Sequence, residues 1–199
     1  PGAVLLHMAL TEGDAQFGAR FFALAGNSVL LSSLTALLAV SLALLVAYAR
    51  RLDPRALTRA AHWAVGLGYA LPGSVIAVGV LIPVARMDNA LAQALHSNFG
   101  WNTGLLFTGT IAALVFACVV RFMTGALQTV DSALHRVTPH MDDAARSLGL
   151  TPGRALRRVH LPLLQRGLLT AGLLVFIDVM KELPATLVMR PFNFDTLAT

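Results

Sequence analysis

The sequence predicts an all-α protein, folded as a polytopic bundle of transmembrane helices. Hydrophobic residues make up 56% of the chain, charged residues only 13%, and the mean hydropathy is +0.70. This balance is too apolar for an ordinary soluble domain of this length. The net charge of +5 does not indicate nucleic-acid binding, because the arginines stand at the ends of apolar stretches and are not interleaved with stacking groups.

The first two predicted spans cover residues 21–49 and 63–84. The first is a nearly uninterrupted apolar run that ends just before Arg50 and Arg51. The second is interrupted by Leu71-Pro72-Gly73, where we expect a kink. Neighbouring helices must then supply hydrogen bonds to the backbone groups that the kink leaves unpaired. Trp63 lies near its start, as an interfacial aromatic residue would.

The last two predicted spans cover residues 104–120 and 167–183. Trp101 precedes the first of them, and Arg121 follows it directly. Between them, residues 121–166 form a predicted cytoplasmic loop. The whole chain, residues 1–199, is then a single transmembrane domain with both ends outside the cytoplasm.

The positions of the basic residues set this orientation. The two predicted cytoplasmic segments hold eleven of the fifteen basic residues, and an excess of Lys and Arg marks cytoplasmic loops. These eleven are Arg50, Arg51, Arg55, Arg59, Arg121, Arg136, Arg146, Arg154, Arg157, Arg158 and Arg166.

The predicted loop contains the signals for a helix-turn-helix elbow. Thr138-Pro139 is typical of an N-cap and first helical residue, and Thr151-Pro152 repeats the signal. Gly149 lies between them and predicts a helix stop, because glycine tolerates the left-handed conformation. The elbow lies between two apolar spans and is therefore a candidate docking site for a cytoplasmic partner.

The same stretch resembles the EAA signature of permease subunits in type I, binding-protein-dependent ABC importers. The signature is E-A-A, three residues, G, nine residues, I, any residue, L-P. This sequence matches it in Ala144, Ala145, Gly149, Leu161 and Pro162. It has Asp143 for the glutamate and Val159 for the isoleucine, which preserve charge and shape respectively.

The resemblance implies the fold, the partners and the site. In that family the elbow inserts into a cleft of a cytoplasmic ATPase dimer, so residues 143–149 would form the coupling helix. Asp143, Ala144, Ala145, Gly149, Leu161 and Pro162 would be the ATPase-coupling residues. A periplasmic solute-binding protein would deliver the cargo, and ATP would be used by the partner subunit at the bacterial inner membrane.

A second cluster of charges, Asp178, Lys181 and Glu182, lies near the outer end of the last span. On a helix, spacings of three and four place Lys181 beside Asp178, so we expect an ion pair there. Charged residues at membrane depth face a bundle interior or an aqueous path. The cluster is therefore either part of a translocation pathway or a structural ion pair that orients the helix.

The end of the chain, from Lys181-Glu182-Leu183-Pro184 to Ala198, resembles ferric iron permeases, particularly their second half. Thiamine and phosphonate permeases have related sequences. The resemblance makes ferric iron the favoured cargo. Family members of this type carry one more span before Phe21 and another after Thr199, so we expect this chain to be incomplete and to pair with a second permease half or copy.

Other function classes find little support in the sequence. No G-x-x-x-x-G-K-[ST] phosphate cradle, nucleophile motif or paired metal-ligand spacing occurs, and Cys118 is the only cysteine. We therefore expect no catalytic residue, cofactor or metal in this chain. Two alternatives stay open: an ion-coupled secondary transporter that uses Asp178, Lys181 and Glu182, and a membrane scaffold that does not transport.

Small residues of the first span predict a helix-packing face. Ser28, Ser32, Thr35, Ala36 and Ala39 follow spacings of three and four. Such a face allows a second helix to approach closely. The same spacing is also compatible with the lining of a translocation route.

Overall fold

The computed structural model describes residues 19–100, 106–191 and 194–198, and every regular element in these ranges is a helix. The all-α prediction is therefore confirmed. Trp101 and the predicted span start at Gly104 lie outside the described residues. The elements are α2 (Ala19–Leu52), α3 (Ala56–Gly66), η2 (Gly68–Ala70), α4 (Gly73–Phe99), α5 (Ile111–Leu134), α6 (Pro139–Ser147), α7 (Pro152–Ala155), the π turn η3 (Leu156–His160), α8 (Leu161–Met180) and α9 (Pro184–Met189).

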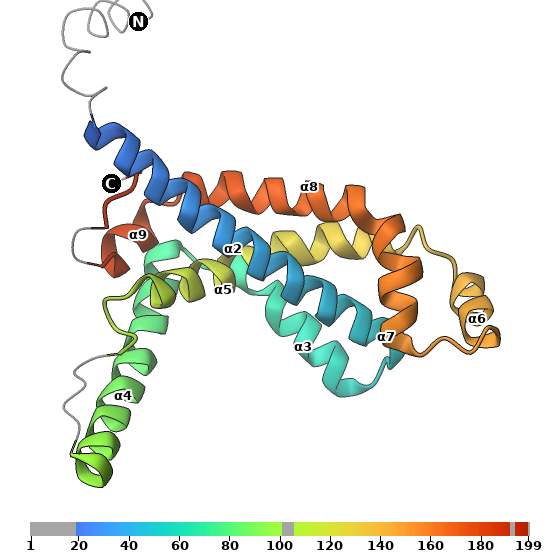
Figure 1. Cartoon of the computed structure of the whole chain (residues 1–199), viewed down its shortest axis with the longest axis horizontal. Helices are drawn as coiled ribbons and strands as arrows, with labels where there is room; N and C mark the ends of the chain where they lie inside the picture. The colour runs from blue at the N-terminus through green and yellow to red at the C-terminus, as the bar shows by residue number, and fades with distance from the viewer. Residues whose placement is uncertain (1–18, 101–105, 192–193, 199) are drawn as a thin grey trace, which may run out of the picture.

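Helices α2, α5 and α8 pack against one another and form the core (Figure 1). The predicted packing face of α2 is buried in this core, which confirms its role in helix assembly; its members are Ser28, Ser32, Thr35, Ala36 and Ala39. Leu114 and Leu127 of α5 and Val175 of α8 fill the space opposite. Small side chains on one helix thus allow large ones on its neighbours to pack closely.

The second predicted span, 63–84, is wrong at both ends. Helix α3 stops at Gly66, and α4 begins at Gly73, directly after Pro72. Helix α4 then continues past Pro83 and Asp88 to Phe99. Asp88 does not end the helix because its buried carboxylate accepts hydrogen bonds from the backbone N–H groups of residues 106–108, at 2.5–3.0 Å.

The third predicted span, 104–120, ends too early. Helix α5 continues through Arg121 to Leu134, so the expected loop 121–166 is helical over its first part. Arg121 stays within the helix because Glu182 supplies its counter-charge, with Arg121 Nη1 3.1 Å from Glu182 Oε1. A buried charge that has a partner does not have to mark a membrane boundary.

The fourth predicted span, 167–183, starts too late and ends slightly too late. A continuous helical segment runs from Pro152 through α7, the π turn and α8 to Met180. Within the π turn, the Leu161 N–H donates to the carbonyl of Leu156, five residues earlier. Pro162 accounts for this turn, because proline has no N–H to donate and its ring crowds the carbonyl four residues before it.

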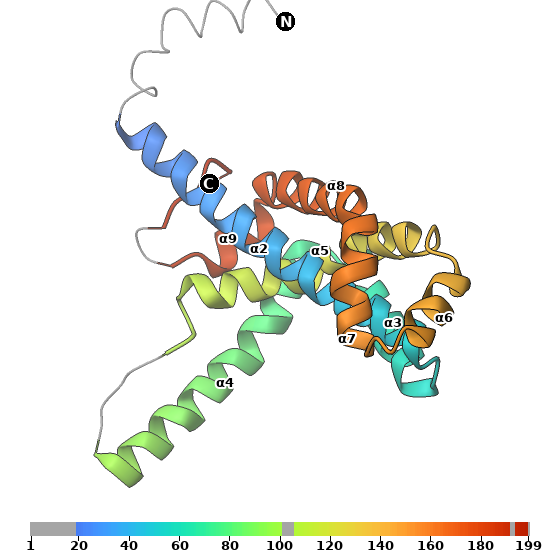
Figure 2. The ribbon, with the colours of Figure 1, turned by 45° about the vertical axis from the view of Figure 1, so that its right-hand side comes forward.

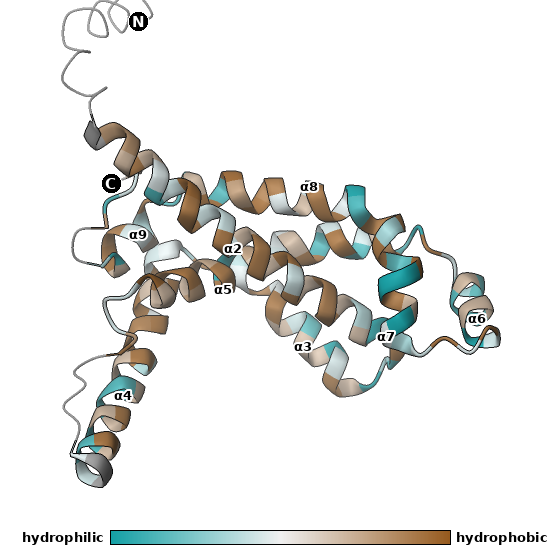
Figure 3. Cartoon of the chain, in the orientation of Figure 1, coloured by the Kyte–Doolittle hydropathy of each residue, from teal (hydrophilic) through white to brown (hydrophobic). Residues whose placement is uncertain are grey.

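Among the described residues, four helices are long and apolar enough to cross a membrane: Phe21–Leu52, Gly73–Ser97, Ile111–Leu134 and Pro152–Met180. Helix α4 leans away from the core in both views and packs against α5 and α9 at its N-terminal end (Figures 1 and 2). Polar residues gather toward the end that carries α6 and α7, whereas the helices of the core are mainly apolar on the outside (Figure 3). The fold therefore places the elbow at one polar end of an apolar bundle.

Candidate functional site

The elbow forms as the local sequence signals predict. Thr138 is the N-cap of α6, Pro139 follows in its first turn, and Thr151 with Pro152 repeats the arrangement at α7. Gly149 has φ +74°. The Gly149 N–H donates to Arg146 O at 2.9 Å and the Leu150 N–H donates to Ala145 O at 3.0 Å, which together make a Schellman C-cap.

The predicted coupling residues of α6 and its C-cap do not all face the same way. Asp143, Ala144 and Gly149 are exposed, whereas Ala145 is buried. Leu148, which is not one of the defined positions of the signature, is 80% exposed. An acidic, a small and a large apolar side chain are thus presented together, and a protein partner could bury all three.

Leu161 and Pro162 lie apart from this exposed surface, at the start of α8. Both are exposed in the described structure. Because they directly follow the π turn, they set the direction in which the chain enters α8 and do not extend the exposed surface of α6. The motif therefore combines a surface on α6 with a backbone feature before α8.

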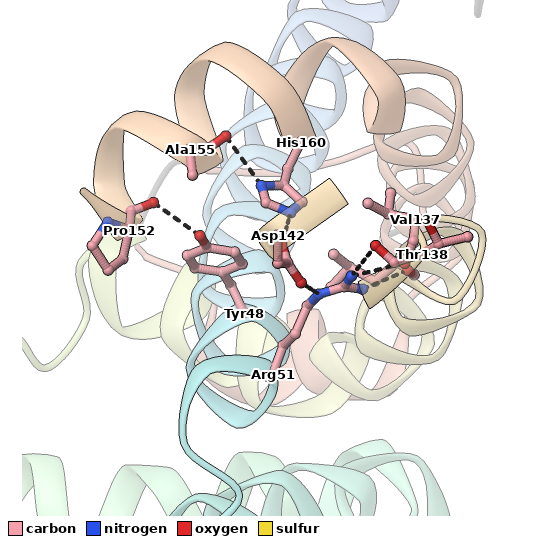
Figure 4. Close-up of polar contacts among 9 residues, drawn as sticks. Tyr48, Arg51, Val137, Thr138, Asp142, Pro152, Ala155 and His160 are labelled. Carbon is pink, nitrogen blue, oxygen red and sulfur yellow. Dashed lines mark hydrogen bonds and ion pairs between the residues drawn. The ribbon is translucent and has the colours of Figure 1, made fainter. Parts of the chain in front are cut away.

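The acidic residue that holds the elbow in place is Asp142, not Asp143. Asp142 Oδ2 accepts a hydrogen bond from Arg51 Nε at 2.8 Å, and its Oδ1 lies 2.7 Å from Nε2 of His160 (Figure 4). Arg51 belongs to the last turn of α2, and His160 ends the π turn before α8. One carboxylate therefore joins α6 to two helical segments of the bundle.

Arg51 also binds the end of α5. Its Nη1 donates to Leu134 O at 2.9 Å and its Nη2 donates to Val137 O at 2.7 Å (Figure 4). A longer contact of 3.4 Å joins Nη2 to Thr138 O. The planar guanidinium can make these bonds simultaneously, because its N–H groups point in fixed, divergent directions.

His160 is fully buried and uses both ring nitrogens. Nε2 faces Asp142, and Nδ1 lies 3.1 Å from the carbonyl oxygen of Ala155. The ring also packs edge-on against Tyr48, with 5.2 Å between the ring centroids, and the Tyr48 hydroxyl donates to Pro152 O at 2.8 Å (Figure 4). These contacts fix the first turns after the elbow against α2.

Two opposing effects act on the pKa of Asp142. Burial raises this pKa, but the hydrogen bonds and positive charges of Arg51 and His160 lower it by more, so that the pKa lies below the ordinary value of an aspartate. The carboxylate therefore stays ionised at neutral pH. No sequence signal distinguished Asp142 from Asp143, because the partners of Asp142 lie 91 and 18 residues away.

A similar cluster lies beside this one. Arg50 Nη1 is 2.9 Å from His62 Nε2, and His62 also contacts the carboxylate of Asp131. This cluster joins α2 to α3 and α5. Arg50 Nη1 also lies 3.8 Å from Asp131 Oδ2. The consecutive residues Arg50 and Arg51 thus each contact an aspartate that is also bonded to a histidine.

The outer charged cluster differs from the prediction. The expected ion pair between Asp178 and Lys181 does not occur in the described part of the chain, where Lys181 is exposed. Glu182, only 5% exposed, pairs instead with Arg121 and also accepts a hydrogen bond from the Ala185 N–H at 3.2 Å. The helix ends at Met180, so the spacing rule that predicted the pair no longer applies to Lys181.

No group of three or more His, Cys, Asp or Glu side chains among the described residues is arranged to hold a metal ion. Cys118 is buried in the core. The described site is therefore built from hydrogen bonds and ion pairs between helices.

Comparison with known proteins gives relatives of one kind. The chain is 29% identical over 181 residues to the Fe(3+)-transport system permease protein FbpB 2 of Haemophilus influenzae, across 89% of this chain and 32% of that protein. It is 26% identical over 158 residues to the trehalose transport system permease protein SugB of Mycobacterium tuberculosis, across 79% of this chain and 51% of that protein.

A third relative is the putative 2-aminoethylphosphonate transport system permease protein PhnV of Salmonella typhimurium, 32% identical over 93 residues, across 47% of this chain and 35% of that protein. No family model matches the chain. The chain spans about a third of the length of the first relative and about half of the second. These similarities and the four membrane-length helices identify a multi-pass membrane protein similar to the permease proteins of transport systems.

Proposed function

We propose that this chain forms part of the membrane permease of an ATP-driven importer and that residues 143–149 are its docking element for a cytoplasmic ATPase. The observation that carries the proposal is the elbow itself. It stands clear of the core at the polar end of the bundle and exposes Asp143, Ala144, Leu148 and Gly149 (Figure 1). The similarity to transport-system permeases supports the same conclusion.

The mechanism we propose is alternating access at the bacterial inner membrane. A periplasmic binding protein delivers the cargo, and ATP binding closes an ATPase dimer in the cytoplasm. That closure moves the elbow and, through it, the helices. ATP would be hydrolysed by the partner alone, and a second permease half or copy would complete the pathway.

Ferric iron is the cargo that we propose first, because one relative, aligned over 89% of this chain, is a Fe(3+)-transport system permease protein. The other relatives are named for trehalose and 2-aminoethylphosphonate, so cargo class differs among similar proteins. The pathway that we propose passes Asp178, Lys181 and Glu182. The bond between Glu182 and Arg121 favours a structural role for that carboxylate and weakens the alternative of an ion-coupled secondary transporter.

The test uses the permease that contains this chain, reconstituted with its candidate ATPase in liposomes. Asp143→Lys combined with Gly149→Trp reverses the exposed charge and places a bulky side chain at the C-cap. We expect the variant to assemble in the membrane but to lose both ATPase docking and ATP-dependent uptake of ferric iron. Docking is measured separately, so it reports on the elbow whichever cargo is transported.

Asp53→Lys serves as the matched control. It makes the same change of charge in the turn between α2 and α3, where Asp53 pairs with the exposed Arg55. We expect this variant to dock the ATPase normally. Uptake that continues unchanged in the absence of a working ATPase would refute the importer and return attention to ion coupling.

A further inference from the structure

Two adjacent carboxylates of the elbow are in opposite surroundings. Asp142 is directed into the molecule, toward Arg51 and His160, whereas Asp143 is exposed. Their side chains are identical, so the helical position alone separates them. Neighbouring residues on a helix are about 100° apart, and they can therefore serve the bundle and an outside partner at the same time.

The inward carboxylate makes side-chain hydrogen bonds that connect α6 to the transmembrane helices in the described structure. Through Arg51 it reaches α2 and the C-terminal end of α5. Through His160 it reaches the segment that leads into α8. Each of these bonds has a charged member, and charge-assisted hydrogen bonds are roughly twice as strong as neutral ones.

The elbow is also joined to the bundle by two short stretches of chain, 135–138 and 148–151. Arg51 binds the first stretch at Val137 O and Thr138 O. The second contains Gly149 in the left-handed conformation. Without the side-chain connection through Asp142, a force applied to α6 could be absorbed by rotation about the second stretch. With it, α6 and the end of α2 must move together.

We propose that Asp142 is a positioning residue that links the elbow rigidly to α2 and α8, so that movement of a docked partner is passed to the membrane helices. The inference rests on the proposed function for the origin of the force. It goes beyond that function in assigning separate tasks to the two carboxylates. Asp143 contacts the partner, and Asp142 transmits the movement.

The first experiment measures the link without any partner. Spin labels on cysteines at Leu148 and Leu37, both exposed, report the distance from the elbow to α2 in a Cys118→Ser background in nanodiscs. We expect a narrow distance distribution in the parent protein and in Asp143→Asn. Asp142→Asn, which makes the same change of charge one residue earlier, should broaden it.

The second experiment adds the candidate ATPase and traps it with ATP and vanadate. Labels on Leu37 of α2 and Ile82 of α4, both exposed, then report movement within the membrane. We expect Asp142→Asn to dock the ATPase as the parent does but to lose the trapped-state shift. Arg51→Lys keeps the positive charge and loses the fork of N–H groups, so it should show the same defect even if Asp142→Asn does not fold.

The outcomes separate the two proposals. A distribution that stays narrow in both Asp142→Asn and Arg51→Lys overturns the link, whatever the protein transports. A broadened distribution in a permease that binds no ATPase supports the link and removes the proposed function. Loss of docking in Asp142→Asn, with a narrow distribution, would place Asp142 in the partner surface and also overturn the inference.

Discussion

At the residue scale, the charges inside the bundle are accommodated in two ways. Arg121 of α5 and Glu182, in the turn between α8 and α9, neutralise each other. Asp88 has no cation beside it in the described structure and is satisfied by backbone N–H groups of residues 106–108. Both arrangements remove the cost of an unpaired buried charge, which would otherwise favour a different fold.

The pair of Arg121 and Glu182 depends on the absence of a side chain at Gly73. A methyl group there would overlap Arg121 Nη1 and Glu182 Oε1. We expect Gly73→Ala to force the two groups apart and to destabilise the protein by about 1–3 kcal/mol, the usual cost of overpacking. Thermal unfolding in detergent checks this value.

Gly79→Ala is the control on the same helix. Its added methyl group meets nothing within 4 Å, and alanine favours a helix by roughly 1 kcal/mol over glycine. We expect this variant to be as stable as the parent or slightly more stable. Equal stability of the two variants would mean that the ion pair does not constrain position 73.

At the element scale, the structure separates features that neighbouring residues decide from features that distant residues decide. Caps belong to the first kind, so Thr138, Gly149 and Thr151 could be placed from the sequence. Span ends belong to the second kind. The predicted spans stopped at residue 84, before Asp88, and directly before Arg121, but partners elsewhere in the chain keep both residues inside helices.

The candidate site divides in the same way. The exposed residues Asp143, Ala144 and Gly149 were predicted from a local pattern, and their placement on the elbow agrees with it. Their role in docking stays a prediction. Asp142 and His160 could not be predicted, because their importance depends on Arg51, which lies about 90 residues before Asp142 and more than 100 before His160.

The C-cap of α6 offers a prediction at this scale. Gly149→Ala would put a β-carbon on a residue with φ +74°, although no atom obstructs it within 4 Å. We expect a cost of about 1–2 kcal/mol from the left-handed backbone alone, and faster amide hydrogen exchange in residues 139–148. ATPase docking should weaken as the end of α6 frays.

Gly153→Ala is the matched control. Gly153 lies four residues later, in α7, has no positive φ, and has no atom within 4 Å of the added methyl group. Exchange in residues 139–148 should be unchanged in this variant. Faster exchange in both variants would show that the elbow responds to any added side chain and not to the left-handed turn.

At the scale of the whole molecule, the two ends of the bundle differ in charge and shape. The last turn of α2, helices α6 and α7 and the π turn lie at the end that carries the elbow (Figure 1). Each of them carries basic residues: Arg50, Arg51, Arg146, Arg154, Arg157 and Arg158. Helix α9 and the start of α2 lie at the opposite end (Figure 1). Arg121 was predicted to lie in the cytoplasmic loop, but it lies within α5 and pairs with Glu182. The other basic residues still give the elbow end an excess of positive charge.

This asymmetry predicts the orientation in the membrane, because segments rich in Lys and Arg stay in the cytoplasm. Single cysteines at the exposed positions Arg55 and Lys181, in a Cys118→Ser background, report the two ends. In intact spheroplasts, a membrane-impermeant maleimide should label position 181 and should reach position 55 only after permeabilisation. The reverse pattern would place the elbow outside, away from cytoplasmic ATP, and would contradict both the orientation and the importer mechanism that depends on it.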